Sequence, residues 1–450
     1  MKVTLIKPNI GRMEHSLYVD EGRMEPLQLG VIAGLTPPHV EVALYDDRME
    51  QIPYDDKTDL VAITVETFTA RRAYEIAKEF RERKIPVIMG GFHPTLIPQE
   101  VQEHCDSMVL GDAEGVWSEI ISDFEKEKKL KPIYKSRPGI GQLGGYIPRR
   151  DLFRGKGYLP ITLTQFGRGC RYSCNFCAIS VFFEKNYFAR PVNEVVAEIE
   201  KQKRRYLFFV DDNIVAHKEE AKKLFRALIP LKKKWVSQGS IDMLEDEELM
   251  ELMVKSGCLG NVIGLESINP YDLREMKKTP NIKKFDHYAT QVRLLRNYGL
   301  QTWAAFTIGH DWETPADVEK TLNFALESKF TFAAYNILMP YPNTALYKKL
   351  EEENRLLYDG KWWLHPEYRF NHASFKPKSM SADQLTEAVY QVRKIWNSNL
   401  SILKRFMEPR TNMRTLERAL IYWTYNPLFK KETFKKHGMY FGLANNKSIN

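Results

Sequence analysis

The feature that most limits what this chain can fold into is the alternation of short apolar runs with stretches of helical periodicity. In residues 1–130, five short apolar runs alternate with helical stretches such as Ala70 to Glu82 and Ala113 to Lys126. The runs are Val3 to Ile6, Val40 to Tyr45, Leu60 to Val65, Val87 to Met89 and Ser107 to Leu110. Such alternation is typical of a parallel sheet covered by helices. Residues 1–130 are therefore predicted to form a Rossmann-like α/β domain.

A linker and a second series of β/α units follow. Residues 131–160 contain four Pro and six Gly, which is typical of a domain linker. Residues 161–345 contain six more apolar runs, separated by stretches long enough for helices: Ile161 to Phe166, Leu207 to Val210, Trp235 to Val236, Val262 to Leu265, Trp303 to Ile308 and Phe332 to Ile337. This series predicts a partial (β/α)6 barrel. Residues 346–450 are predicted to be helical, with helices at Ala382 to Ile402 and Leu416 to Tyr425.

Composition excludes several classes of protein. Of the 450 residues, 43% are hydrophobic and 28% charged, which excludes a disordered or collagen-like chain. The formal charge of +8 is concentrated in residues 401–450, which hold ten Lys/Arg and three Asp/Glu, so a general nucleic-acid-binding surface is not expected. The sequence contains neither 18 consecutive apolar residues nor a signal-peptide pattern. We therefore expect a cytoplasmic protein.

Three of the five cysteines form the most specific motif in the sequence. Cys170, Cys174 and Cys177 follow the first predicted barrel strand with the spacing C-x3-C-x2-C. Three thiolates on one loop can bind three irons of a four-iron cluster and leave the fourth iron open to a substrate or cofactor. A structural zinc site would need a fourth Cys or His at finger spacing, and a ferredoxin would need a fourth cysteine. The spacing therefore favours an open four-iron cluster.

The loop from Gly167 to Cys177 resembles the cluster-binding loop of radical S-adenosylmethionine (radical SAM) enzymes. The front domain resembles the cobalamin-binding domain that one subgroup joins to its radical SAM core. The matching segments are Glu25 to Gly30, Tyr45 to Asp47, Gly90 to Thr95 and Leu110 to Gly115. This resemblance implies a [4Fe-4S] cluster on the three cysteines, S-adenosylmethionine (SAM) bound to the open iron, a 5'-deoxyadenosyl radical as its product, and cobalamin in the front domain.

The resemblance also implies that the ends of the barrel strands contact SAM. Phe176 would flank the adenine, and Glu266 would bind the ribose hydroxyls. The Gly-Gly-Glu motif of many radical SAM enzymes is missing after the second strand. The turn Pro340 to Thr344 resembles the P-x-P-G-T turn of the subgroup with Asn343 in place of Gly, and Asn tolerates a left-handed backbone. The expected SAM contacts are Phe176, Asp211, Asp212, Gln238, Glu266, Ser267, Phe306, Ile308 and Gly309.

The front domain lacks one signature of its family. The D-x-H-x-x-G motif that supplies a histidine to cobalt is absent, since Lys7 to Gly11 contains no His. Cobalamin would then bind without a lower histidine, as in the methylating members; the alternative is a domain that keeps the fold without the cofactor. The expected cobalamin contacts are Thr64, Gly90, Gly91, His93, Gly111 and Glu114.

Several candidate residues also have simpler interpretations. Asp211 and Asp212 could cap the helix that begins near Lys218. Gly90 and Gly91 could only allow a tight turn, and His93 could be a turn residue. The remaining cysteines, Cys105 and Cys258, are expected to be small buried hydrophobic side chains.

The leading hypothesis is a radical SAM enzyme that functionalises an unactivated carbon, with methyl transfer through cobalamin as the expected reaction. Its expected partners are a small-molecule or lipid substrate and a flavodoxin or ferredoxin as electron donor. One alternative is radical cyclisation or carbon-carbon bond formation with a vestigial cobalamin domain. A second is an iron-sulfur or corrinoid carrier protein. A tRNA methylthiotransferase would need three further cysteines in front, where residues 1–150 contain only Cys105.

The basic segment 401–450 has two interpretations. Its Lys and Arg residues are interleaved with apolar ones, among them Phe406, Leu420, Tyr422, Trp423 and Phe429. One interpretation is a helical cap whose aromatic side chains pack on the barrel while the charges face water. The other is an amphipathic surface that lies on an anionic membrane and gives access to a membrane-held substrate.

Overall fold

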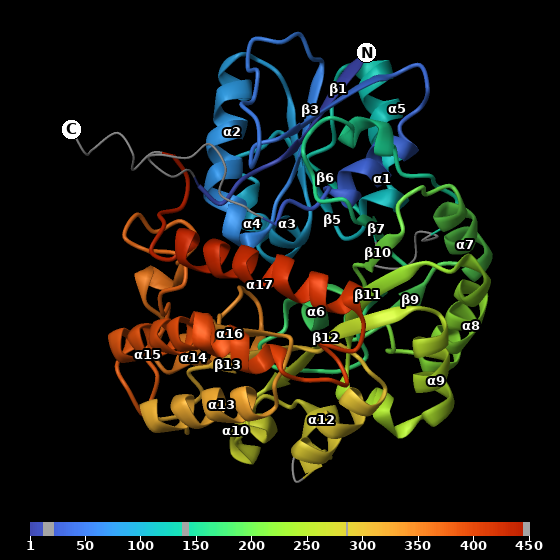
Figure 1. The fold of residues 1–450 in the computed structure, drawn as a ribbon. Helices are drawn as coiled ribbons and strands as arrows, with labels where there is room; N and C mark the ends of the chain where they lie inside the picture. Colours follow the sequence, from blue (N-terminus) through green and yellow to red (C-terminus); the bar gives the residue numbers. More distant parts are fainter. Residues whose placement is uncertain (12–21, 137–143, 285–286, 444–450) are drawn as a thin grey trace. The chain divides into compact units, whose positions relative to one another are not determined.

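The computed structural model describes residues 1–11, 22–136, 144–284 and 287–443. The chain divides into two compact units (Figure 1). Unit 1 comprises Met1–Leu159, Tyr358–Phe370 and Lys435–Asn450, and unit 2 comprises Pro160–Leu357 and Asn371–Phe434. Two segments from the predicted helical C-terminal region thus belong to unit 1.

Unit 1 is a Rossmann-like domain, as the sequence predicts. Its six-stranded sheet has the order β2-β1-β3-β4-β5-β6, and every neighbouring pair is parallel. The strands are β1 (Lys2–Lys7), β2 (Glu41–Asp46), β3 (Leu60–Thr64), β4 (Val87–Gly90), β5 (Ser107–Leu110) and β6 (Ile133–Lys135). The last of these lies in the range predicted as a linker. In a sheet of order 2-1-3 the crevice for a ligand opens at the carboxyl ends of β1 and β3.

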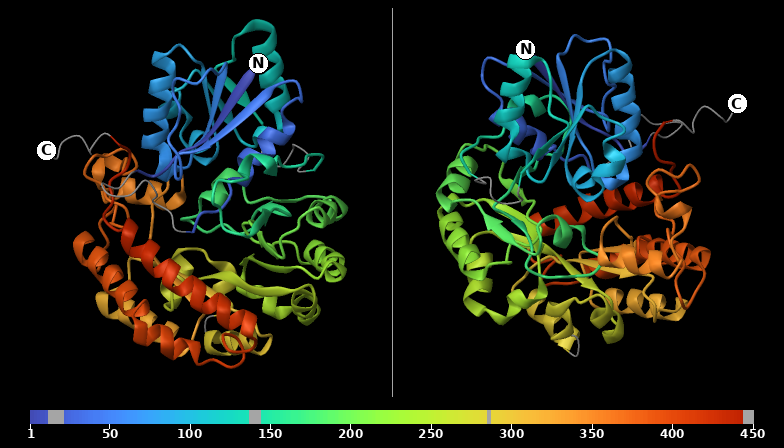
Figure 2. Two further views of the ribbon diagram at one scale, coloured as in Figure 1. Left: turned by 45° about the horizontal axis from the view of Figure 1, so that its top comes forward. Right: turned by 180° about the vertical axis from the view of Figure 1, so that it is seen from behind.

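Helices cover both faces of this sheet. Figure 1 and Figure 2 show α2 on one face and α1 and α5 on the other. The helices are α1 (Leu27–Leu35), α2 (Ala70–Glu82), α3 (Phe92–Leu96), α4 (Pro98–Val101) and α5 (Trp117–Glu127). The predicted bounds of α2 are confirmed, because its apolar residues Ala73, Ile76, Ala77 and Phe80 recur at helical spacing and are all buried. The helix predicted from Ala113 begins instead at Trp117, after a short 3-10 turn.

Unit 2 contains the predicted series of β/α units. Its six parallel strands have the order β14-β13-β12-β11-β10-β7, so β7 and β14 are the two edges of an open sheet. The strands are β7 (Thr162–Thr164), β10 (Tyr206–Phe209), β11 (Lys234–Gly239), β12 (Cys258–Glu266), β13 (Trp303–Ile308) and β14 (Phe332–Ile337). A separate antiparallel hairpin joins β8 (Gly167–Gly169) to β9 (Tyr187–Ala189).

The helices of unit 2 share one core with its sheet. That core contains residues of α7, α8, α9, α12, α13 and α15. The bounds are α6 (Ala178–Phe182), α7 (Val192–Glu200), α8 (Lys218–Leu228), α9 (Glu247–Lys255), α10 (Pro270–Glu275), α11 (Thr279–Ile282), α12 (Tyr288–Asn297), α13 (Pro315–Glu327), α14 (Ala345–Glu352), α15 (Ala382–Trp396), α16 (Asn399–Phe406) and α17 (Leu416–Lys436).

Two predictions for the C-terminal helices are wrong in their bounds. The helix predicted from Ala382 to Ile402 is two helices, because the Ser398 side chain accepts a hydrogen bond from the Ser401 N–H and caps a new helix. The helix predicted to end at Tyr425 continues as α17 through Pro427 to Lys436. None of the helices in the described ranges is long and apolar enough to span a bilayer.

Candidate functional site

The cysteine loop begins at a tightly packed hairpin. Cys170 directly follows β8, in which Gly169 has a φ of +82°. A Cβ atom on Gly169 would lie 2.2 Å from the carbonyl oxygen of Asn186. One on Gly167 would lie 2.3 Å from the hydroxyl oxygen of Tyr187. Gly169 therefore requires glycine, because its backbone is left-handed and its neighbour is backbone, whereas Gly167 lacks a side chain where the Tyr187 side chain packs.

Two carboxylates at the end of β10 hold this hairpin. Asp211 accepts hydrogen bonds from the N–H groups of Phe166 and Gly167 at 2.9 and 2.6 Å. Asp212 accepts one from the Gly169 N–H at 2.8 Å. Asp211 is completely buried, and burial raises its pKa to about 7 although the two N–H groups oppose the shift. The two residues thus position the backbone that leads into the cysteines.

The alternative role of Asp211 and Asp212 as helix caps is wrong. Helix α8 begins at Lys218, and its cap is His217, whose Nδ1 accepts a hydrogen bond from the Glu220 N–H at 3.4 Å. The carboxylates point to the cysteine hairpin instead. Their predicted contact with the methionine part of SAM stays a prediction.

The three thiols are free and lie in different surroundings. Burial raises the pKa of Cys174 to about 11. Burial also raises the pKa of Cys177, which lies at the start of α6, while the N–H groups of Ser180 and Ile179 oppose the shift because they favour the thiolate. Cys170 is half-buried, and its Sγ lies 3.8 Å from a donor, the Asn213 side-chain nitrogen.

The donor set fits a cluster with several irons. Among the residues that the structure describes, no three His, Cys, Asp or Glu side chains surround one point as a single metal ion requires. Thiolates that bind three different irons need not meet at one point. The three free thiols of this loop can therefore bind three irons. Backbone N–H groups at the start of α6 face Cys177, and the Asn213 amide faces Cys170.

Helices α10 and α14, which follow β12 and β14, bind the middle of the loop. The Asn175 N–H donates to the carbonyl oxygen of Met276, beyond β12, at 3.0 Å. The Asn175 carbonyl oxygen accepts from the Leu346 N–H, beyond β14, at 2.9 Å. Together with Asp211 and Asp212 of β10, connections from three strands therefore converge on the cysteine loop.

A buried ion pair lies beside the cysteines. Lys278 Nζ is 2.8 Å from Glu266 Oε1. Burial lowers the pKa of Lys278, but the carboxylate of Glu266 and the thiols of Cys174 and Cys177 raise it by more, so that the net shift is upward and the ammonium stays charged. Glu266 itself has a left-handed backbone with a φ of +65°, a strained conformation for a residue other than glycine. Sequence reasoning missed Lys278, which no local motif marks.

Three predicted SAM contacts lie in β13 or directly after it. Phe306 and Ile308 are completely buried, and Phe306 stacks on Tyr335 with ring centroids 5.5 Å apart. Only their backbone groups therefore remain as candidate contacts for adenine. Gly309 has a φ of +111°, and its N–H donates to Glu313 Oε2 at 2.6 Å. Burial raises the pKa of Glu313 to about 8.

The remaining predicted contacts of unit 2 lie at or near strand ends. Phe176 is partly buried against the hydrophobic core. Gln238 is half-buried near the end of β11, and the Ser267 hydroxyl donates to Asp272 at 2.9 Å. The prediction for the turn after β14 is confirmed, because Asn343 has a φ of +63°.

The front domain places its predicted contacts at the carboxyl edge of its sheet. Thr64 ends β3, Gly90 ends β4, and Gly111 follows β5 with Glu114 in the next turn. The Gly111 N–H donates to the Thr95 hydroxyl oxygen at 3.0 Å. These four predicted contacts come from three neighbouring strands or their following loops, at the edge where ligands of such folds bind.

Gly90 ends β4 and Gly91 follows it, and the local backbone requires glycine at only one of these two positions. Gly91 has a φ of +113°, and a Cβ atom there would lie 2.8 Å from the Val65 carbonyl oxygen. A Cβ atom on Gly90 would meet only the Val109 side chain, at an ordinary 3.5 Å. The turn alone therefore explains Gly91, and packing among the described residues does not explain Gly90.

The interpretation of His93 as a simple turn residue is wrong. It lies in helix α3 and is completely buried. Its Nε2 is 3.0 Å from the Tyr74 hydroxyl and 3.2 Å from Glu100 Oε1, which also accepts from the Trp363 indole N–H at 2.8 Å. Its Nδ1 has no hydrogen-bond partner among the described residues.

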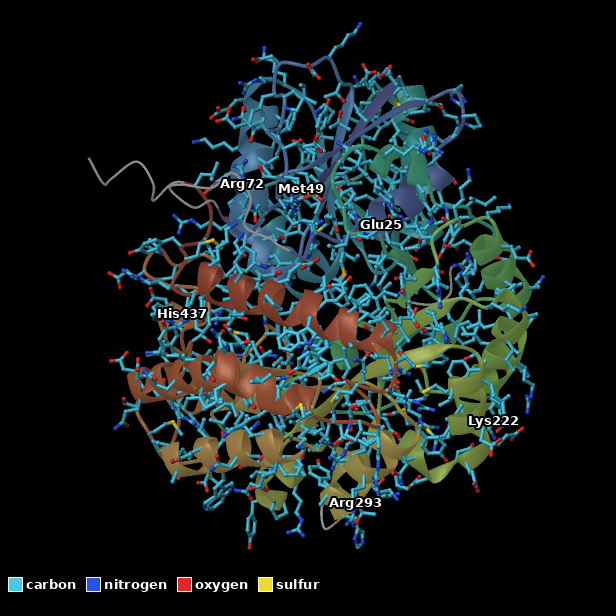
Figure 3. All side chains as sticks on the ribbon, viewed as in Figure 1. Glu25, Met49, Arg72, Lys222, Arg293 and His437 are labelled. Atoms are coloured by element: carbon cyan, nitrogen blue, oxygen red, sulfur yellow. The ribbon has the colours of Figure 1, made fainter. Side chains whose placement is uncertain are left out.

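The Tyr45 to Asp47 segment forms ion pairs within unit 1. Asp47 Oδ2 and Oδ1 are 2.8 and 3.0 Å from Arg72 of α2, which Figure 3 labels. Asp46 binds Arg48 in the same manner and accepts from the Tyr158 hydroxyl at 2.9 Å. These carboxylates therefore tie the end of β2 to its neighbours.

A known protein family matches part of unit 2. Residues 164–325 match the family model of the radical SAM superfamily. This stretch is a radical SAM domain. The domain implies a [4Fe-4S] cluster and SAM, as the cysteine motif predicts. Cys105 and Cys258 are buried away from that motif in the sequence, as expected.

Relatives of the radical SAM domain cover the rest of the chain as well. Bacteriochlorophyllide d C-12(1)-methyltransferase of Chlorobaculum tepidum is 28% identical over 418 residues, 90% of this chain and 89% of the relative. The structure of TsrM, a radical SAM methyltransferase from Kitasatospora setae with cobalamin and a [4Fe-4S] cluster bound, has a TM-score of 0.62 at 20% identity and covers 78% of each chain. OxsB with aqua-cobalamin and SAM has a TM-score of 0.67 at 13% identity over 96% of this chain and 72% of its own. The chain therefore has the fold of the radical SAM enzymes with a front cobalamin-binding-type domain.

Proposed function

We propose that this protein is a radical SAM enzyme that transfers a methyl group to an unactivated carbon with the help of cobalamin. The observation that carries the proposal is the convergence of the segments that follow β10, β12 and β14 on a loop of three free thiols, in a chain whose front domain has the cobalamin-binding type of fold. The similarity to methyltransferases along most of the chain favours methyl transfer over cyclisation or carbon-carbon bond formation.

Different residues of unit 2 would bind the cluster, position its loop and contact SAM. Cys170, Cys174 and Cys177 would bind three irons, and Asp211 with Asp212 keeps their hairpin in place. When bound, the cluster and SAM supply a carbon radical that abstracts a hydrogen atom from the substrate. The SAM contacts named above remain part of this proposal.

Lys278 and Glu266 are suited to the charged end of SAM, which for Glu266 replaces the ribose contact that the family resemblance implies. The methionine moiety of SAM carries a carboxylate and an ammonium group. A half-buried ammonium and a buried carboxylate 2.8 Å apart, beside the cysteines, offer one partner for each. Each charge could then exchange its present partner for one on SAM without being left unpaired, which is the arrangement that buried charges require.

The front domain offers a surface for cobalamin. Gly90 lacks a side chain where the described packing would admit one, and a flat macrocycle that approaches the strand end would explain its absence. The buried His93 Nδ1 is a further polar atom without a described partner at the same edge. Bound cobalamin would supply a carrier that accepts a methyl group and passes it on. The vestigial domain of the alternative hypothesis would not need Gly90.

We further infer the partners and location of the enzyme. An apolar small molecule or a lipid fits a reaction at an unactivated carbon, and a flavodoxin or ferredoxin fits the need for a low-potential electron. The near-neutral charge of the first 400 residues does not favour nucleic acid. A cytoplasmic location with peripheral membrane contact is consistent with these partners.

The test begins with the cluster. Anaerobically reconstituted protein should contain about four irons per chain and yield 5'-deoxyadenosine from SAM with a strong reductant. Cys174→Ala should lose both properties, whereas Cys258→Ala, which removes a buried cysteine outside the motif, should keep them. Iron near four per chain in a Cys170/Cys174/Cys177 triple Ala variant would overturn the cluster assignment.

The second part tests methyl transfer. Wild-type protein should bind hydroxocobalamin in a form without a lower histidine, visible in the spectrum of the cobalt(II) state. A folded protein that forms deoxyadenosine but does not bind cobalamin would favour the cyclisation or coupling alternative. With substrate, S-adenosylhomocysteine should accompany deoxyadenosine.

A further inference from the structure

The C-terminal helices of unit 2 expose an unusual number of large apolar side chains. Single exposed apolar residues are normal on a protein surface, but a concentration of them marks an interaction site. Leu416 is 77% exposed, Leu400 61% and Leu420 59%. Eight such residues fall within positions 395–423, and we call them the exposed apolar face: Ile395, Leu400, Leu403, Met407, Met413, Leu416, Leu420 and Trp423.

These residues follow helical spacing. On α16 and the residue after it, Leu400, Leu403 and Met407 are separated by three and four positions. On α17, Leu416, Leu420 and Trp423 are separated by four and three. Residues with these spacings lie on one side of a helix. Each helix therefore carries an exposed apolar stripe in addition to its buried side.

The two stripes lie on helices that pack against each other. The Tyr422 hydroxyl of α17 donates to the Ile402 carbonyl oxygen of α16 at 2.6 Å. The rings of Phe406 and Trp423 have centroids 5.1 Å apart. The exposed apolar face therefore extends over both α16 and α17, which are labelled in Figure 1.

The charges around this face have one sign. Between residues 394 and 431 the exposed charged side chains are Lys394, Lys404, Arg410, Arg414 and Lys431. The two acidic residues of this range are engaged elsewhere. Glu408 is buried and pairs with Arg296, and Glu417 accepts from the Tyr206 hydroxyl at 2.8 Å. Within residues 394–431, the exposed charges beside the apolar face are thus all positive.

We propose that this face docks on an anionic membrane surface. The apolar side chains would enter the headgroup region, where Trp is favoured, and the Lys and Arg side chains would lie near lipid phosphates. A second copy of the chain fits less well, because a symmetric contact would bring five like charges of each copy together. A protein interface would also be expected to contain few lysines at its centre.

The structure refines the two interpretations of the basic segment. Some of its aromatic residues pack inward as a cap would, since Tyr422 is buried and Phe429 contacts Trp303 with centroids 4.5 Å apart. Leu416, Leu420 and the half-exposed Trp423 instead face outward. The segment thus contains both an inner packed side and an outer apolar side.

Vesicle flotation tests the proposal without cluster, SAM or cobalamin, so its result is independent of the proposed function. Wild-type protein should float with vesicles of phosphatidylcholine and phosphatidylglycerol but much less with phosphatidylcholine alone, and added salt should release it. Each Lys or Arg near such a surface strengthens binding about fivefold, so Lys394→Gln with Lys404→Gln should weaken it about 25-fold.

A matched pair of variants tests the apolar contribution. Leu416→Glu with Leu420→Glu should abolish flotation, whereas Ile229→Glu, an exposed apolar residue outside the face, should not. Circular dichroism and melting should match wild type, because all three side chains are exposed in the folded chain. Equal flotation on neutral and anionic vesicles, or a dimer in solution that the double Glu variant dissociates while flotation is absent, would overturn the proposal. If a variant fails to fold, the dependence of wild-type flotation on lipid charge and on salt still tests the proposal.

Discussion

Replacement of Gly169 by Ala should damage the cysteine hairpin by an amount that can be worked out from its geometry. A left-handed backbone costs a residue other than glycine about 1–2 kcal/mol, and Gly169 has a φ of +82°. The new Cβ atom would also lie 2.2 Å from the Asn186 carbonyl oxygen, so that the hairpin must move, at a cost of about 1–3 kcal/mol. Ala has fewer backbone conformations than Gly in the unfolded chain, which offsets about 0.4–1 kcal/mol of this destabilisation. The expected loss in the free energy of unfolding is therefore about 1–4.6 kcal/mol, with a middle value of about 3 kcal/mol.

Gly155→Ala is the matched control for this substitution. Gly155 has a similar φ of +76°, but its added Cβ would have no neighbour within 4 Å. It should therefore lose only the backbone cost less the same offset for the unfolded chain, which leaves about 0–1.6 kcal/mol. Melting followed by circular dichroism should show a fall of about 5–15 °C for Gly169→Ala and a smaller one for Gly155→Ala.

Iron content distinguishes damage to the cysteine loop from general loss of stability. Because Cys170 follows Gly169 directly, displacement of the hairpin should lower the iron bound by reconstituted Gly169→Ala below that of Gly155→Ala, measured at a temperature where both are folded. A Gly169→Ala protein that melts with wild type and binds as much iron would refute the claim that the hairpin geometry holds the cluster loop.

Three further predictions concern the cofactors and the pH dependence of stability. Gly90→Ala should leave stability within about 1 kcal/mol but weaken cobalamin binding at least tenfold in titrations, whereas Gly91→Ala should destabilise the domain itself. Glu266→Gln should weaken SAM binding by about 1.5–3 kcal/mol in calorimetry, because it removes a charged acceptor and leaves Lys278 without its partner; unchanged affinity would contradict the assignment. Burial raises the pKa of Glu313 from its ordinary 4.5 to about 8, so the folded state retains a proton that the unfolded state loses, and the free energy of unfolding should fall as pH rises from about 4.5 to 8. Glu313→Gln should remove this part of the pH dependence in urea titrations.

Local patterns in the sequence were sufficient for the fold class and for a cluster motif, whose three cysteines stay the predicted ligands. The alternation of apolar runs and helical stretches predicts the two parallel sheets, because strand and helix periodicities are properties of neighbouring residues. The spacing of Cys170, Cys174 and Cys177 likewise identifies a cluster motif within eight residues. Asn343 could be assigned its left-handed conformation because backbone preference is a local property.

Contacts between distant residues were decided only by the tertiary structure. Lys278 lies beside Cys174 through the packing of separate β/α units, and no local pattern marks it. Asp211 was equally consistent with a helix cap until its partners, the N–H groups of Phe166 and Gly167, were located.

The orientation of the C-terminal helices also depended on tertiary packing. Apolar residues occur on more than one side of α17, so the sequence could not show which of them face the core. Tyr422 is buried because it packs on α16, and Leu416 and Leu420 are exposed because nothing in the described chain covers them. The local sequence determines that such a helix forms, whereas the neighbours to which it packs determine which side remains for a partner.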